Sequence, residues 1–146
     1  MKINLNAFAF DYGTAVSNPT ANEGNRSFSL NNQSGYVIKK WSIDKIIFKD
    51  NNEERCDYLM EVQKPDKTVY YWVELKGKDV VKACRQILST IRLVNVLEEA
   101  NQEARVITSG TSKIDIRTLD YLRLDRLMRS KKGRLITYTN ERIETI

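Results

Sequence analysis

The sequence contains no histidine among its 146 residues. This absence excludes Ser-His and Cys-His nucleophilic triads, HExxH metalloproteases, zinc deaminases and every nuclease that uses a histidine base. The groups that remain for catalysis are carboxylates, lysine, tyrosine, cysteine and a metal ion held by oxygen ligands. If the chain is an enzyme, its chemistry must come from this short list.

Cysteine is scarce, and long apolar runs are missing. Cys56 and Cys84 are the only two cysteines, a number that suits a reducing compartment and is too small for a structural zinc site. No stretch approaches the roughly 18 apolar residues of a membrane span, and the first residues do not have the pattern of a signal peptide. We therefore expect a cytoplasmic protein without a membrane partner.

The residues that are present have an ordinary globular composition with a basic bias. Hydrophobic residues make up 41% of the sequence and charged residues 29%, so the chain can bury a core within one domain. The formal net charge is +5. Such a charge favours an anionic partner, of which nucleic acid is the commonest.

The pattern along the chain predicts an N-terminal arm followed by one α/β domain. Residues 13–35 are rich in Asn, Ser and Gly, which predicts a loop with at most one short strand, so we divide the chain into an arm at 1–35 and a domain at 36–146. Within the domain, hydrophobic periodicity predicts strands over 36–48, 56–62 and 69–76, a helix over 80–101, a strand over 104–110, a basic amphipathic helix over 117–132, a strand over 134–139 and then a polar tail.

This order of elements predicts an α/β fold, bordering on α+β, with a mixed sheet. The first three strands form an antiparallel meander. The helix that follows begins after Asp79, a good N-cap residue, and is long enough to make the next strand parallel. Gly133 is expected to end the later helix.

Three polar residues stand out in the hairpin formed by the second and third predicted strands. Antiparallel pairing brings Asp57, at the start of one strand, beside Glu74 and Lys76 at the end of the next. Two neighbouring carboxylates repel each other unless a cation lies between them, and a hydrated Mg²⁺ ion fits such a pair. Lys76 would then activate water or stabilise charge on a phosphate. The alternative is a solvent-facing salt-bridge pattern on the sheet surface.

This hairpin, with the helix that carries Gln86, resembles the PD-(D/E)XK nuclease superfamily. The resemblance covers residues 36–110 and implies a restriction-endonuclease-like core with Mg²⁺ as cofactor, for which Mn²⁺ can substitute. It implies that the metal ligands are Asp57, Glu74 and the main-chain carbonyl of Leu75. It also implies that the catalytic residues are Asp57, Glu74, Lys76 and Gln86.

Three positions differ from the usual pattern of that superfamily. The proline that gives the superfamily its name is missing, since Cys56 precedes Asp57. Its members usually carry a further acid on a helix before the first strand, and here the possible substitutes are Asp44 and Glu23, neither of which lies in a predicted helix. The position four residues after Gln86 is often aromatic in members, whereas this chain has Thr90.

The later helix is the second candidate for function. Its apolar residues gather on one side at helical spacing, and its basic residues gather on the other. With Lys82 of the earlier helix, the expected nucleic-acid-binding residues are Arg123, Arg126, Arg129, Lys131 and Lys132. Such a ridge would contact phosphates without reading sequence. The alternative is an amphipathic helix with a solvated basic face.

The sequence as a whole predicts Mg²⁺-dependent phosphodiester hydrolysis of nucleic acid by a small DNA endonuclease. Cutting both strands normally needs two active sites, so we expect a homodimer. The alternative is a module of nuclease fold without catalytic activity, which binds nucleic acid or another protein.

Overall fold

The computed structural model describes residues 2–7, 19–46, 55–75, 79–109 and 118–146. The elements in chain order are η1 (Leu5–Ala7), β1 (Thr20–Glu23), β2 (Arg26–Asn31), β3 (Val37–Ser42), α1 (Ile43–Ile46), β4 (Tyr58–Gln63), β5 (Thr68–Leu75), α2 (Val80–Leu93), β6 (Asn101–Thr108), α3 (Leu119–Ser130), β7 (Leu135–Thr139) and β8 (Glu141–Thr145). This mixture of helices and strands confirms the predicted α/β to α+β class.

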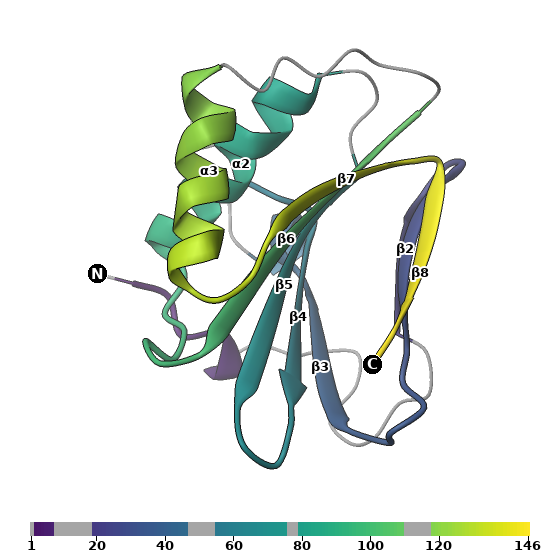
Figure 1. Ribbon diagram of the computed structural model, residues 1–146, viewed down its shortest axis with the longest axis vertical. Helices are drawn as coiled ribbons and strands as arrows, with labels where there is room; N and C mark the ends of the chain where they lie inside the picture. The colour runs from purple at the N-terminus through teal and green to yellow at the C-terminus, as the bar shows by residue number, and fades with distance from the viewer. Residues whose placement is uncertain (1, 8–18, 47–54, 76–78, 110–117) are drawn as a thin grey trace.

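A five-stranded sheet in the order β3-β4-β5-β6-β7 forms the centre of the fold. The strands β3, β4 and β5 are antiparallel neighbours, whereas β6 runs parallel to β5 and β7 runs parallel to β6. Both α2 and α3 lie on one side of this sheet (Figure 1). The predicted meander, crossover helix and parallel strand are therefore confirmed.

A second sheet, in the order β1-β2-β8, lies on the other side of the five-stranded sheet (Figure 1). Ala21, Phe28 and Leu30 point inward from it and pack with residues of the central strands such as Met60 and Tyr71. The prediction of a loop was therefore wrong over 20–31, and that of a polar tail was wrong over 141–145. Residues 13–18 lie outside the described residues.

The two errors have different causes. Strands β1 and β2 form a tight antiparallel hairpin in which Glu23 pairs with Arg26, whereas β8 is stabilised by a distant partner. Strand β2 pairs in parallel with β8, more than a hundred residues later. Along β2, buried Phe28 and Leu30 alternate with the small polar residues Ser27 and Ser29. This is the period of a half-buried strand, but the Asn- and Ser-rich surroundings obscure it.

The helix α2 begins as predicted and ends earlier. The Asp79 side chain accepts a hydrogen bond from the Lys82 backbone N–H at 2.8 Å, which confirms the predicted N-cap. The helix was expected to continue to residue 101, but it ends at Leu93. The reason is that the chain after Leu93 pairs with the N-terminal segment. The Ile3 N–H donates to the Leu93 carbonyl at 2.6 Å, and the Ile3 carbonyl accepts from the Asn95 N–H at 2.8 Å.

The first predicted strand was also too long. The strand β3 ends at Ser42, and the chain then forms the short helix α1. Ile43 donates its backbone N–H to the carbonyl of Asp57 at 2.9 Å, which connects the start of α1 to the residue just before β4.

The end of α3 confirms the predicted role of Gly133. Lys132 has a positive φ of 60°, and Gly133 donates its N–H to the Met128 carbonyl at 2.8 Å. A Cβ atom on Gly133 would lie 1.8 Å from the Gln102 carbonyl oxygen of β6. Only glycine allows this close approach between the helix end and the sheet.

The main core lies between the helices and the five-stranded sheet. Trp41, Leu59 and Trp72 point from the sheet toward Ile87 of α2 and Leu124 of α3, and all five side chains are fully or almost fully buried. Among the residues that the structure describes, no helix has the length and apolar character needed to cross a bilayer.

Candidate functional site

The β4–β5 hairpin places Asp57 and Glu74 opposite each other. Tyr58 pairs with Val73, so the next position outward pairs Asp57 with Glu74. The Asp57 Oδ2 atom accepts a hydrogen bond from the backbone N–H of Leu75 at 2.8 Å. The two predicted metal-binding side chains are thus brought together at the end of β5.

Glu74 lies on the helix-covered face of the sheet, because side chains alternate along β5 and buried Trp72 points to the same side. Asp57 lies just before the start of β4. Glu74 is only 2% exposed, whereas Asp57 is half-buried. A solvent-facing salt-bridge pattern at Glu74 does not agree with this burial.

The surroundings of Asp57 disfavour its ionised form. Burial, together with the negative charges of Glu23 and Asp44, raises the pKa of Asp57 from 3.8 to about 6. The hydrogen bonds from Leu75 N–H and with Glu74 act in the opposite direction. Glu23 and Asp44 are the two acids that the sequence offered as substitutes, and both lie within electrostatic range of Asp57. The site therefore concentrates negative charge and favours a proton or a cation.

Gln86 supports the chain just before Asp57. Its Nε2 atom donates to the Arg55 carbonyl at 3.1 Å, and its Oε1 atom is buried without a hydrogen-bond partner among the described residues. One turn later, the Thr90 hydroxyl donates to the Gln86 carbonyl at 2.8 Å and accepts from the Cys56 N–H at 2.7 Å. Thr90 thus anchors the start of the hairpin.

The two cysteines are poor candidates for chemistry. Burial raises the pKa of Cys56 well above its usual value, and the charges of Glu74 and Asp57 raise it further. Burial also raises the pKa of Cys84 to about 12. Both thiols stay protonated at neutral pH and are neither nucleophiles nor metal ligands in this state.

The donor set at the hairpin fits a hydrated Mg²⁺ ion better than zinc. Among the described residues, no group of three or more His, Cys, Asp or Glu side chains is arranged to hold a metal ion. Mg²⁺ commonly uses only one or two carboxylates and keeps several waters, a requirement that Asp57 and Glu74 can meet. The predicted lysine, Lys76, lies outside the described residues, and the role of the Leu75 carbonyl stays a prediction.

The helix α3 has the predicted two-sided character. Leu124 and Met128 are fully buried, and the basic side chains of the opposite face are exposed at Arg123, Arg126, Arg129 and Lys132. Two members of the face have neighbours: Arg129 pairs with Asp125 at 3.1 Å, and Lys131, which is half-buried, donates to the Glu98 carbonyl at 3.3 Å. Lys82 lies half-buried on α2 rather than on this face.

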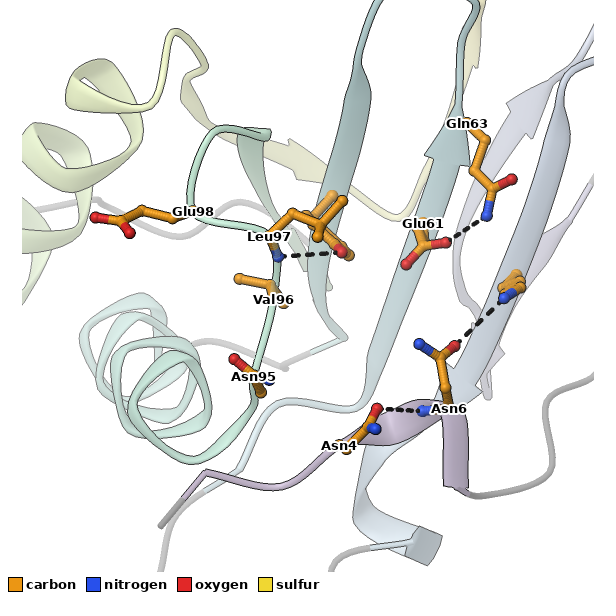
Figure 2. Close-up of a pocket in the computed structure, with 10 residues that line it drawn as sticks. Asn4, Asn6, Glu61, Gln63, Asn95, Val96, Leu97 and Glu98 are labelled. Atoms are coloured by element: carbon orange, nitrogen blue, oxygen red, sulfur yellow. Dashed lines mark hydrogen bonds between the residues drawn. The ribbon is translucent and has the colours of Figure 1, made fainter.

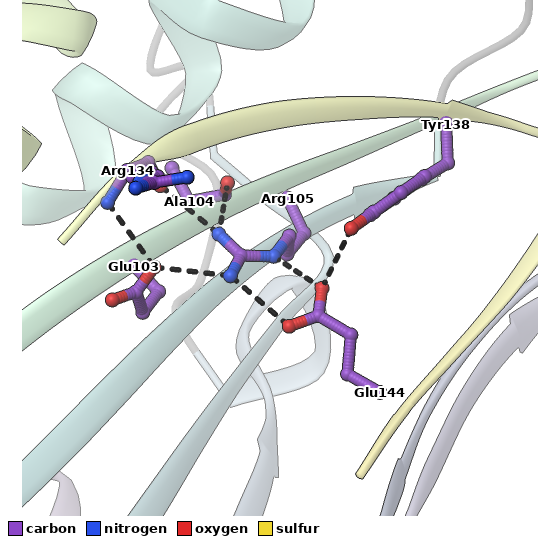
Figure 3. Close-up of polar contacts among 6 residues, drawn as sticks. All are labelled: Glu103, Ala104, Arg105, Arg134, Tyr138 and Glu144. Atoms are coloured by element: carbon purple, nitrogen blue, oxygen red, sulfur yellow. Dashed lines mark hydrogen bonds and ion pairs between the residues drawn. The ribbon is translucent and has the colours of Figure 1, made fainter.

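A buried polar cluster around Arg105, whose partner on β8 the sequence did not indicate, lies between the two sheets (Figure 3). The Arg105 side chain is 4% exposed and makes two bonds to Glu144, at 2.6 and 3.1 Å. It also donates to Glu103 and to the carbonyls of Ala104 and Arg134, each at 3.0 Å. All five guanidinium N–H groups are satisfied, so this cluster connects β6 with β8 and has a structural role.

No family model, curated protein or solved structure matches this chain. Its function must therefore be inferred from its own residues.

Proposed function

We propose that the protein is a Mg²⁺-dependent nuclease, most simply a DNA endonuclease, whose metal is held by Asp57 and Glu74. The observation that carries the proposal is the cross-strand pair itself. Two acids stand opposite each other, one of them almost fully buried, with Glu23 and Asp44 in electrostatic range. Such an arrangement costs free energy unless a proton or a cation neutralises it.

The residues of the hairpin, together with Gln86 of α2, have defined roles in this proposal. The Leu75 N–H fixes the orientation of the Asp57 carboxylate, and the Gln86 amide holds the chain before it. Glu74 and the Leu75 carbonyl complete the ligands, and Lys76 is the proposed catalytic lysine. When bound, Mg²⁺ would neutralise the acids and polarise the phosphodiester, for which Mn²⁺ can substitute.

The basic face of α3, defined by Arg123, Arg126 and Arg129, is the proposed contact for the phosphate backbone. These side chains are exposed, and the chain carries a net charge of +5. The helix α3 packs against α2, whose N-terminus follows the hairpin closely in the chain. A duplex needs both strands cut, so we propose that two copies of the chain act together.

A plasmid-nicking assay tests this function. Wild-type protein with Mg²⁺ is expected to convert supercoiled plasmid to nicked and linear forms, and EDTA is expected to stop it. Glu74→Gln should abolish cutting, because it removes a ligand charge at nearly constant volume. Glu141→Gln, the same change at an exposed position of β8, is the matched control. Undiminished cutting by Glu74→Gln would overturn the proposal.

A module without catalytic activity is the second candidate. It is favoured by one observation: within the described part of the chain, no three acidic, cysteine or histidine side chains converge on one metal position. Such a module would bind DNA or RNA in EDTA, with affinity that falls as salt rises, and would never cut it.

A further inference from the structure

A polar pocket on the helix-covered face lies between β4, the N-terminal segment with Asn4 and Asn6, and the segment after α2 (Figure 2). Its volume is about 500 Å³, which is within the size range of small-molecule sites. Glu61 lies four residues beyond Asp57 on β4, a separation of about 13 Å along a strand. The pocket is therefore separate from the proposed metal site.

Glu61 is the buried acid of this pocket. Glu61 is 7% exposed, and its Oε1 atom accepts a hydrogen bond from Gln63 Nε2 at 2.8 Å. Burial, and after it the charge of Glu61, raises the pKa of Tyr70 to about 12, so the Tyr70 hydroxyl lies within electrostatic range of this carboxylate. A carboxylate has about four acceptor positions. The hydrogen bond from Gln63 uses one of them and holds the group in place, which leaves acceptor positions for a ligand.

A lysine stands next to this acid. Lys39 of β3 is the direct cross-strand partner of Glu61, so the Cβ atoms of the two residues lie about 4.5–5.5 Å apart on one face. Lys39 Nζ donates to Asn6 Oδ1 at 3.3 Å, a contact with the N-terminal segment. Cation and carboxylate are thus presented side by side in one wall of the pocket.

The remaining walls combine amide groups with apolar surface. Asn6 and Asn95 contribute carboxamides, and Val96 and Leu97 contribute aliphatic side chains from the segment after α2. Leu97 is 50% exposed. A flat ligand could cover this apolar surface while its polar edge faces Lys39 and Glu61.

We propose that this pocket binds a guanine base. The Watson–Crick edge of guanine presents an acceptor, O6, followed by two donors, N1–H and N2–H. Lys39 can donate to O6, and two of the remaining acceptor positions of Glu61 can receive N1–H and N2–H. Adenine, cytosine and uracil do not present one acceptor followed by two donors. The site uses neither the metal nor the acids of the hairpin, so it goes beyond the proposed nuclease function.

The test is an NMR titration of the ¹⁵N-labelled full chain in EDTA with five nucleoside monophosphates: GMP, IMP, AMP, CMP and UMP. Their phosphates are the same, so differences in affinity report the base. We expect GMP to bind most tightly, about tenfold more tightly than IMP, which lacks only the 2-amino group that contacts Glu61. The shifted resonances should include those of Tyr70 and Asn95.

Two variants and one control test whether Glu61 and Lys39 recognise the guanine base. Glu61→Gln should remove the preference for GMP over IMP, and Glu141→Gln should preserve it. Lys39→Met should weaken GMP and IMP equally, since both carry O6, and provides the test if Glu61→Gln does not fold. Equal binding of the five nucleotides, no binding at millimolar concentration, or a GMP preference that survives Glu61→Gln would overturn the inference.

The outcome is independent of the nuclease assay, because the titration contains no metal. Guanine binding without plasmid cutting would overturn the proposed nuclease and support this pocket. Plasmid cutting without a preference for guanine would support the proposed nuclease and overturn the inference about this pocket.

Discussion

The pKa of Asp57 leads to a prediction about stability that can be worked out from the structure. The folded-state pKa is raised from 3.8 to about 6, so the folded chain binds the proton more tightly than the unfolded chain. The resulting stability is fully present below about pH 4 and is lost as the pH rises through about 6. A shift of about two units corresponds to about 3 kcal/mol, and we reduce this to about 1–2 kcal/mol because Asp57 is only half-buried.

The substitution Asp57→Asn isolates this effect. Asparagine keeps a side-chain oxygen that accepts the hydrogen bond from the Leu75 N–H. It removes the negative charge that is repelled by Glu23 and Asp44. We expect the variant to exceed wild type in free energy of unfolding by about 1–2 kcal/mol at about pH 8 in EDTA, and to equal it at about pH 4.

Urea denaturation followed by tryptophan fluorescence measures these differences, with Glu141→Gln as the control. Adding Mg²⁺ at about pH 8 should then stabilise wild type and leave Asp57→Asn unchanged, because a ligand stabilises only the state that binds it. A variant that is no more stable than wild type at the higher pH would refute the reasoning about Asp57.

Three further predictions concern the fold and the basic face. Arg105→Met removes the ionic partner of half-buried Glu144, which keeps its hydrogen bond with Tyr138, so urea denaturation should show a loss of about 2–3 kcal/mol; an unchanged midpoint would contradict a structural role for the cluster. Gly133→Ala places a methyl group 1.8 Å from a backbone oxygen and should cost about 3 kcal/mol or more by the same assay, whereas near-wild-type stability would argue against this approach of α3 to β6. Arg123→Gln and Arg126→Gln should each lower the slope of log affinity for duplex DNA against log salt by about 0.9, as measured by fluorescence anisotropy, and slopes equal to that of wild type would remove α3 from the interface.

The central part of the fold could be predicted because its signals are local. The β4 and β5 strands, the Asp79 cap and the two-sided α3 each follow from spacing within one short segment. The strand β8 could not be predicted in this way, because its partner β2 lies more than a hundred residues earlier. The local β1–β2 hairpin was missed because its Asn- and Ser-rich sequence obscures the strand pattern. The early end of α2 has the same cause, since Ile3 pairs with the chain just after Leu93.

The difference between local and long-range signals also applies to the candidate sites. Asp57 and Glu74 could be placed together from sequence because a tight hairpin fixes which residues face each other. The polar pocket could not, because it joins Asn6, Glu61 and Asn95 from three distant segments. Arg105 did carry a signal, as a single charged residue within an apolar strand needs a buried partner, but the sequence does not indicate that this partner is on β8.

The most direct test of the central claim is a calorimetric titration of Mg²⁺ into wild type and Glu74→Gln at about pH 8, where Asp57 is ionised. The proposed site predicts metal binding by wild type and by Glu141→Gln, and none by Glu74→Gln. Absence of binding by wild type, or equal binding by Glu74→Gln, would contradict the assignment of Asp57 and Glu74 as metal ligands.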